Sequence, residues 1–227
     1  MHRFFIVLFI IFGSAPMTAQ IHEIGMFLGG SNYIGDIGPT DYIAPNAPAF
    51  GILYKWNRSP RHSWRASATV SKVKSFDADS KVPARKSRDY KFENELKEVS
   101  LGLEFNFFDF NLHDDKPKFT PYIYTGLSYL QYDGLFFVNG QTKSDSEHST
   151  IAIPMILGLK GRIFTNFVLG FESGVRFSFA DDIDGSNPSN GNLTSQGFGN
   201  LKSKDWYVFT GLTLTYTFGD KPCYCAE

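Results

Sequence analysis

The sequence predicts an all-β protein, an eight-stranded antiparallel up-and-down transmembrane β-barrel of the outer-membrane type. Three observations support this fold class: an alternating strand with aromatic ends, an exported chain without a long apolar helix, and connections that alternate between long and short. The composition agrees, because 23 Phe, 11 Tyr and 21 Gly favour strands and turns over helices.

The clearest strand is the segment 205–218 near the end of the chain. Alternate positions from Trp206 to Phe218 form a mostly apolar face, and the positions between them are mostly small and hydroxylated. Trp206 begins the apolar face, and Tyr216 and Phe218 end it, as in a strand that crosses two lipid headgroup belts. A tilted membrane strand needs roughly 9 to 11 residues, so this segment is long enough to be the closing strand of a barrel.

The N-terminus has the pattern of a targeting segment. A positive start, an apolar run at 4–12 and a small-residue cleavage site before Gln20 predict a signal peptide at 1–19. No later run approaches 18 apolar residues, so a membrane-integral form of this chain must be a barrel. We expect the barrel at 20–218 and a periplasmic cysteine-containing tail at 219–227. The net charge of −1 provides no general field that would attract nucleic acid.

Eight segments show strand-like alternation, and an even number of strands closes an up-and-down barrel. The predicted strands are 22–29, 49–56, 63–73, 95–108, 120–132, 150–163, 167–179 and 205–218.

The connections between these strands alternate in length. The long ones are 30–48, 74–94, 133–149 and 180–204, whereas 57–62 and 164–166 are short and 109–119 is intermediate. Outer-membrane barrels have short periplasmic turns and longer outer loops, so both chain ends are expected in the periplasm. We assign no structure to the Gly/Asn/Ser-rich stretch 184–200 and expect it to be mobile.

Charged residues share one strand face with small residues, which predicts a polar barrel interior. An eight-stranded interior is just wide enough for side chains to fill, and an unpaired buried charge costs several kcal/mol. We therefore expect opposite charges to pair and to close the lumen, rather than to line an open pore. The alternative, an exposed face of a soluble sandwich, fits the signal peptide and the aromatic strand ends less well. These lumen residues are Lys55, Arg65, Glu104, Lys160, Glu172 and Arg176.

The two cysteines, Cys223 and Cys225, lie in the tail on either side of Tyr224. An even number of cysteines in an exported protein suggests a disulfide. One intervening residue would leave a small, strained ring, so pairing with another chain and a metal contact are alternatives. Two thiolates alone are an incomplete metal site, and we expect no cofactor.

The turn 57–62 concentrates positive charge at the short-turn end, because it holds Arg58, Arg61 and His62. The connection 109–118, with H-D-D-K-P-K, is also highly charged. Such turns could bind a periplasmic partner through charged hydrogen bonds, and ordinary solvated turns are the alternative.

One segment suggests catalysis. His148 and Ser149, next to Glu147, would suit a serine hydrolase at the outer rim, such as a barrel-type lipid A deacylase. Neighbours on a strand point to opposite faces, so these residues are no ready-made nucleophile and base, and a polar loop end is the alternative. The sequence has no G-x-S-x-G, phosphate-binding glycine loop or H-E-x-x-H motif. We expect no enzyme activity and no small-molecule substrate.

A resemblance covers residues 23–65 most densely. The stretch E-I-G-M-F-L-G-G-S-N-Y-I-G-D-I-G from Glu23, A-P-N ending at Asn46, Y-K-W-N from Tyr54, S-P-R from Ser59 and W-R from Trp64 carry it. These motifs resemble the PorG-like outer-membrane barrels of Bacteroidota, which belong to the type IX secretion and gliding machinery.

The resemblance implies a non-enzymatic barrel that associates, at its periplasmic face, with lipoprotein and periplasmic ring subunits of that machinery. The rim and tail residues named above would then contact these partners. Unlike many barrels, the chain continues past Phe218, so an aromatic residue commonly read by insertion machinery is internal. The runner-up is an OmpA-like structural or adhesion barrel that acts through its outer loops, above all 180–204.

Overall fold

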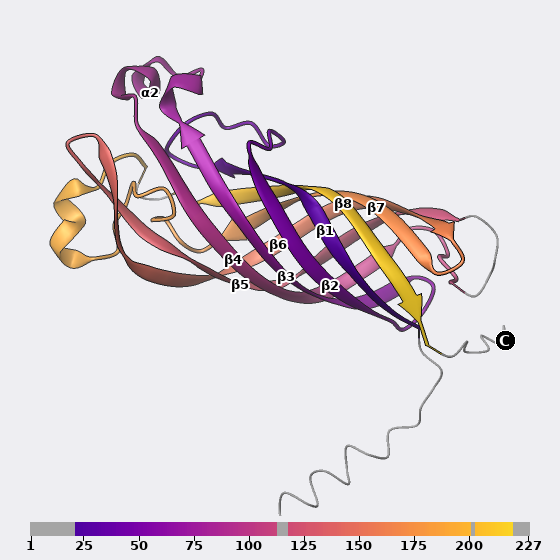
Figure 1. Ribbon diagram of the computed structural model, residues 1–227. Helices are drawn as coiled ribbons and strands as arrows, with labels where there is room; N and C mark the ends of the chain where they lie inside the picture. The colour runs from indigo at the N-terminus through magenta and orange to yellow at the C-terminus, as the bar shows by residue number, and fades with distance from the viewer. Residues whose placement is uncertain (1–20, 113–117, 201–202, 220–227) are drawn as a thin grey trace, which may run out of the picture.

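The computed structural model describes residues 21–112, 118–200 and 203–219. In these residues, eight antiparallel strands form a closed barrel in which each strand pairs with the next and β1 pairs with β8 (Figure 1). This confirms the predicted fold class. The strands are β1 (Ile21–Ile34), β2 (Ala47–Asn57), β3 (His62–Phe76), β4 (Lys91–Asn106), β5 (Phe119–Val138), β6 (Gln141–Phe164), β7 (Phe167–Ser178) and β8 (Trp206–Phe218).

The strands alternate between an apolar exterior and a buried interior. Along β4, every second side chain is exposed: Val99 is 60% exposed and Leu101 59%, whereas Glu104, on the other face, is fully buried. A soluble barrel would bury its apolar residues inside, so this inverted arrangement is that of a barrel with a lipid-facing surface. Among the described residues, no helix has both the length and the apolarity needed to cross a bilayer.

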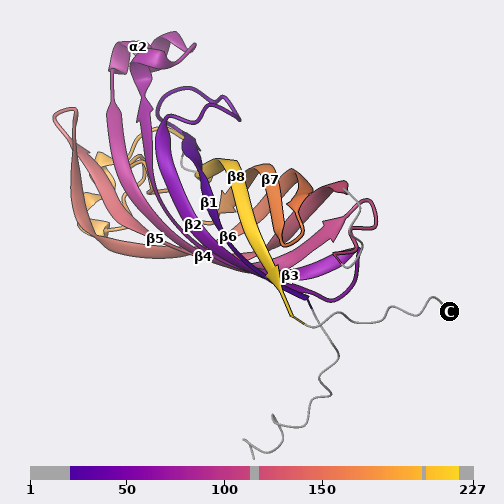
Figure 2. The same ribbon diagram turned by 45° about the vertical axis from the view of Figure 1, so that its right-hand side comes forward.

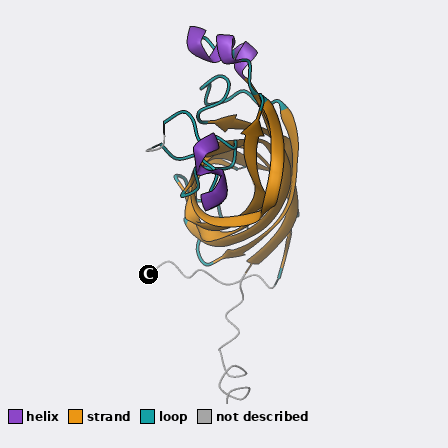
Figure 3. Ribbon diagram, turned by 90° about the vertical axis from the view of Figure 1, so that its left-hand side faces the viewer, coloured by secondary structure: helices purple, strands orange, loops and turns teal. Residues whose placement is uncertain are grey.

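The two ends of the barrel differ. At one end, short connections join β2 to β3 and β6 to β7, and the described chain begins and ends there (Figures 1 and 2). The other end holds the longer loops, with the short helices η1 (Asp77–Asp79), α2 (Pro83–Arg88) and η2 (Gly191–Gln196) (Figure 3). We call these the short-turn rim and the long-loop rim.

The connection predicted at 133–149 is wrong, because β5 and β6 continue through most of it as a long hairpin. Leu135 pairs with Ser144, and the hairpin ends at Asn139 and Gly140, whose φ angles are 52° and 78°. Two successive residues with positive φ are typical of a two-residue hairpin turn, and Asn-Gly is its strongest sequence signal. The flanking residues 141–149 are polar, so they lack the apolar alternation by which the other strands were recognised.

The expectation that 184–200 has no structure is also wrong. This stretch contains η2, and its first residues are held in the barrel mouth, where Asp184 and Ser186 are completely buried. The backbone NH of Phe198 donates to the carbonyl of Ser186 at 2.7 Å, which folds the loop back on itself.

An apolar core fills the long-loop half of the barrel beneath this loop. Ile183 joins inward-facing side chains of the strands, among them Val73, Leu96 and Leu130, all of which are completely buried. The interior is therefore not lined only by small and charged residues, as the sequence pattern suggested. The charged layer lies nearer the short-turn rim.

Candidate functional site

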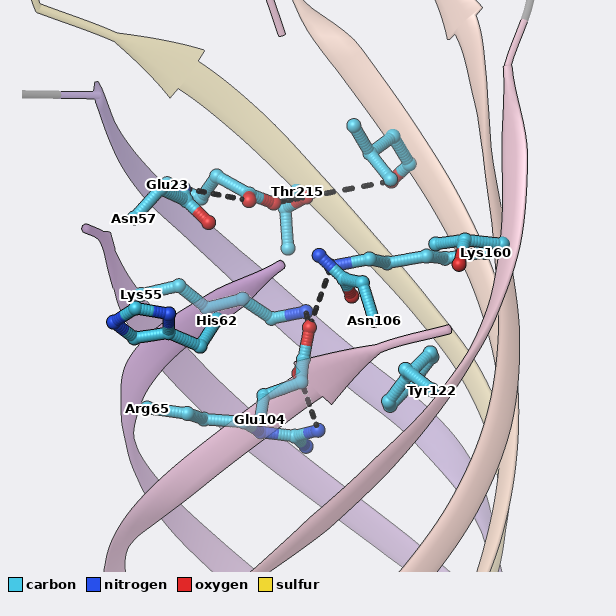
Figure 4. Close-up of polar contacts among 12 residues, drawn as sticks. Glu23, Lys55, Asn57, His62, Arg65, Glu104, Asn106, Tyr122, Lys160 and Thr215 are labelled. Atoms are coloured by element: carbon cyan, nitrogen blue, oxygen red, sulfur yellow. Dashed lines mark hydrogen bonds and ion pairs between the residues drawn. The ribbon is translucent and has the colours of Figure 1, made fainter. Parts of the chain in front are cut away.

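The centre of the charged layer is the carboxylate of Glu104 on β4. Its Oε1 accepts hydrogen bonds from Lys55 Nζ at 2.8 Å and from Lys160 Nζ at 2.6 Å, and Arg65 Nη1 lies 3.5 Å from Oε2 (Figure 4). These cations come from β2, β6 and β3, so the contacts connect strands across the lumen. Charges so deeply buried require such partners.

A second carboxylate, Glu172 on β7, completes this layer. Arg65 donates to both of its oxygens, at 2.7 Å and 2.8 Å, and Tyr122 donates to Oε2 at 2.5 Å. Arg65 thus bridges two glutamates, in the bidentate geometry that a planar guanidinium favours.

Arg176 lies in a separate pair further along the lumen. Its Nε is 3.6 Å from Glu98 Oε2, its guanidinium lies 4.3 Å from the ring centre of Phe209, and Tyr207 donates to Glu98 at 2.6 Å. The structure places all six predicted lumen charges inside the barrel, but brings only five of them into one network.

Sequence reasoning missed two lumen residues, Glu98 and Glu23. Glu98 has the same strand parity as Glu104, which is the signal that could have identified it. Glu23 accepts from Asn57 at 2.9 Å and from Thr215 at 2.6 Å. With both included, the buried charges of the described strands balance, four cations against four carboxylates. They are Lys55, Arg65, Lys160 and Arg176, and Glu23, Glu98, Glu104 and Glu172.

At the short-turn rim, the predicted contact residues differ in how they are engaged. Arg61 forms an ion pair with Asp109 and donates to the carbonyl of Phe107 at 2.7 Å, so its guanidinium helps to hold two turns together. The ring of His62 lies 2.7 Å from Ser59 Oγ within its own turn. Arg58 is exposed and lies 4.9 Å from the ring centre of Trp56. Cys223, Tyr224 and Cys225 lie outside the described residues.

At the long-loop rim, the structure separates the residues that the sequence placed together. His148 faces the barrel mouth, whereas Glu147 and Ser149 are exposed on the other face, and Glu147 pairs with Lys97 at 3.5 Å. The two residues are therefore no nucleophile and base, as the strand alternation predicted, because adjacent residues of β6 point to opposite sides.

The mouth also holds buried acids. Asp205 is 2% exposed and Asp184 is completely buried. Burial raises the pKa of Asp205 well above its usual range, and the nearby Asp184 raises it further, although Asp205 accepts hydrogen bonds from Tyr33 and from the NH of Ile183. Burial likewise raises the pKa of Asp184.

The family model described as "Domain of unknown function (DUF6089)" matches residues 2–227. The chain belongs to this family. Among curated proteins, none matches the sequence.

Several solved structures have a similar chain path. The N-terminal β-barrel domain of OprF from Pseudomonas aeruginosa is 13% identical and has a TM-score of 0.49, with 88% of this chain and 99% of that chain covered. Neisserial surface protein A is 10% identical, with a TM-score of 0.45 and coverage of 88% and 96%. Ail of Yersinia pestis is 12% identical, with a TM-score of 0.42 and coverage of 89% and 100%.

Proposed function

We propose that this protein is a closed outer-membrane barrel that anchors periplasmic lipoprotein and ring subunits of the type IX secretion system. The observation that supports it best is the balanced charge layer, in which Glu104 and Glu172 pair with cations from strands around the lumen. A barrel whose lumen is filled in this way offers no path for a solute, so we expect its function to lie at its rims.

The apolar exterior and the predicted signal peptide favour the outer membrane as its location. The outward apolar face of an exported barrel is stable in contact with lipid, and a closed barrel satisfies the backbone hydrogen bonds of its strands within the bilayer. In the usual orientation of such barrels, the short-turn rim and both termini face the periplasm.

The short-turn rim is the surface we assign to the partner. Arg58 is exposed beside Trp56, which gives a cation and an aromatic ring at one place. Arginine and tryptophan are enriched among the residues that dominate protein interfaces. Arg61 and His62 shape the turn through their internal contacts, and β8, which precedes the cysteine-containing tail in the sequence, ends at the same rim. The anchor role requires no catalytic group.

Partner recovery from native membranes tests this proposal. The tagged chain is crosslinked, purified and analysed by mass spectrometry, alongside Arg58→Glu and a Cys223→Ser, Cys225→Ser double variant. We expect the wild type to recover periplasmic lipoprotein and ring subunits, and Arg58→Glu to lower their recovery about tenfold, since 1.4 kcal/mol of binding energy corresponds to that factor. Loss of recovery in the double variant would place a contact at the tail.

The matched control is Lys86→Glu, which reverses an exposed charge on α2 at the opposite rim. Its partner recovery should equal that of the wild type. If no variant at the short-turn rim or tail changed recovery, while deletion within the long loops abolished function, the anchor proposal would be wrong and the OmpA-like adhesion role would be favoured.

A further inference from the structure

Three side chains at the long-loop rim have the arrangement of a nucleophile, a base and an orienting acid. His148 Nδ1 lies 2.8 Å from Asp182 Oδ2, and His148 Nε2 lies 3.0 Å from Ser146 Oγ. Ser146 and His148 are two residues apart on β6, so both face the barrel mouth, and Asp182 reaches them from the loop after β7. In chain order the constellation is Ser-His-Asp, recognisable by geometry rather than by any sequence motif.

The carboxylate of Asp182 is fixed in position by hydrogen bonds. Asp182 is 3% exposed, and it accepts a hydrogen bond from Tyr132 at 2.5 Å and another from Ser189. An ionised carboxylate only accepts hydrogen bonds, so the imidazole must present Nδ1–H to it. The lone pair of Nε2 then faces the hydroxyl of Ser146, which is the tautomer that a general base requires.

The imidazole of His148 is also fixed in position by its neighbours. The ring of Tyr132 packs edge-on to that of His148 at 6.1 Å between ring centres, and any side chain at Gly134 would collide with the imidazole. Gly134 lies at the register shift between Asp133 and Leu135, where β5 departs from regular pairing with β6. Such irregularities recur beside active sites because they re-aim side chains. Ser146 itself is exposed to solvent.

We propose that Ser146, His148 and Asp182 form a hydrolytic site for carboxylic esters at the long-loop rim. Ser146 Oγ attacks the ester carbonyl carbon as its proton passes to His148 Nε2; the ester C–O bond breaks, and the leaving alcohol takes that proton. Water then attacks the acyl-serine, passes a proton to His148 and releases the carboxylic acid, and the serine oxygen regains the proton. Asp182 orients the imidazole and stabilises its charged form.

The position favours esters found near a membrane surface. On β6, the exposed apolar side chain of Ile151 lies three residues from His148, about 10 Å along the strand. His148 therefore lies just beyond the apolar band, and Ser146, two residues further along the strand, is exposed to solvent. Acyl esters of membrane lipids and soluble esters share the reacting group, and the experiment separates them. The site lies at the rim opposite the proposed anchor surface, so either proposal can fail without the other.

Covalent labelling of the purified full-length barrel with an alkyl fluorophosphonate tests the site. We expect one adduct on Ser146, located by peptide mass spectrometry. Ser146→Ala should abolish the adduct, and Asp182→Asn and His148→Gln should slow labelling at least tenfold. The matched control, Ser149→Ala, changes the neighbouring serine on the other face and should label as the wild type does.

Heat-modified migration on gels shows which variants retain the folded barrel, and the adduct on wild-type Ser146 is informative even where a variant does not fold. Hydrolysis is then measured with p-nitrophenyl butyrate and with phosphatidylethanolamine vesicles containing lipopolysaccharide. Hydrolysis of one of these substrates by the wild type, together with its loss in Ser146→Ala, supports the site. The substrate that is hydrolysed shows whether the site takes soluble esters or membrane-lipid esters. No adduct on Ser146, labelling that persists in folded His148→Gln, or hydrolysis of neither ester would overturn it.

Discussion

The lumen charges show how single residues determine the state of the barrel interior. Glu104 is fully buried and faces three cations, so it neutralises the two buried lysines, Lys55 and Lys160, and shares Arg65 with Glu172. Alternation along the strands predicted the inward direction of Lys55 and Arg176. Their pairing could not be predicted, because it depends on which strands lie opposite one another across the lumen.

Replacing Glu104 by Gln should strongly destabilise the barrel. The substitution keeps the shape of the side chain but leaves Lys55 and Lys160 without their carboxylate, and breaking a buried pair costs about 3–5 kcal/mol. The measurement is urea unfolding of the refolded barrel in detergent. Glu95→Gln, an exposed substitution on the same strand, should stay within about 0.5 kcal/mol of the wild type.

Asp205 gives the mouth a pH dependence. The pKa of Asp205 is raised while the loop 179–205 lies in the barrel mouth, which we call the seated state. The Asp205 carboxyl therefore holds a proton in the seated state that it loses when the loop leaves the mouth. The seating is therefore most stable below the ordinary carboxyl pKa of about 3.9 and weakens as pH rises toward the raised value. Hydrogen exchange of residues 180–200, corrected for intrinsic rates, should show stronger protection at pH 5 than at pH 8. Asp205→Asn should flatten this dependence, and greater protection at pH 8 in the wild type would contradict the account.

At the scale of elements, strands with an apolar outward face could be predicted and those outside the lipid band could not. The segment 205–218 has aromatic ends and became β8 almost as expected, whereas the β6 half of the β5–β6 hairpin tip, residues 141–149, is polar on both faces. The pairing of that tip rests on the Asn139–Gly140 turn, a local signal that hydrophobic alternation does not contain. Ser146 and His148 lie on this same hairpin, so the contact between their side chains could not be predicted from the sequence.

Replacing Gly140 by Val should loosen the hairpin tip without unfolding the barrel. A β-branched residue is strained at φ 78°, where the cost is about 1–2 kcal/mol. Hydrogen exchange should increase at residues 135–145, while the urea midpoint of the barrel stays the same. Gly191→Val is the control, since nothing lies within 4 Å of an added Cβ there, and it should leave the hairpin unchanged.

At the scale of the whole molecule, the interior has two closures: the charged layer, and the apolar core beneath the loop 179–205. The sequence predicted a closed barrel from its charges alone. It did not show the second closure, because inward-facing apolar residues such as Val73 and Leu96 meet only when all eight strands and the loop are assembled.

The closed interior predicts that the reconstituted protein carries no steady ionic current across a planar bilayer. A variant that lacks residues 181–203 should also be silent, since the charged layer remains in place below the mouth. Stable single-channel steps in the wild type would mean that the lumen opens in the membrane, and steps in the shortened variant alone would make the loop the principal seal.

The most direct test of the anchor role is site-specific photo-crosslinking in native membranes. A benzoylphenylalanine replaces either Arg58 at the short-turn rim or Lys86 on α2 at the long-loop rim, and the adducts are identified by mass spectrometry. The account predicts a periplasmic lipoprotein or ring subunit attached at position 58 and none at position 86. Adducts with such a subunit only at position 86, or none at position 58 in cells with an active secretion system, would contradict it.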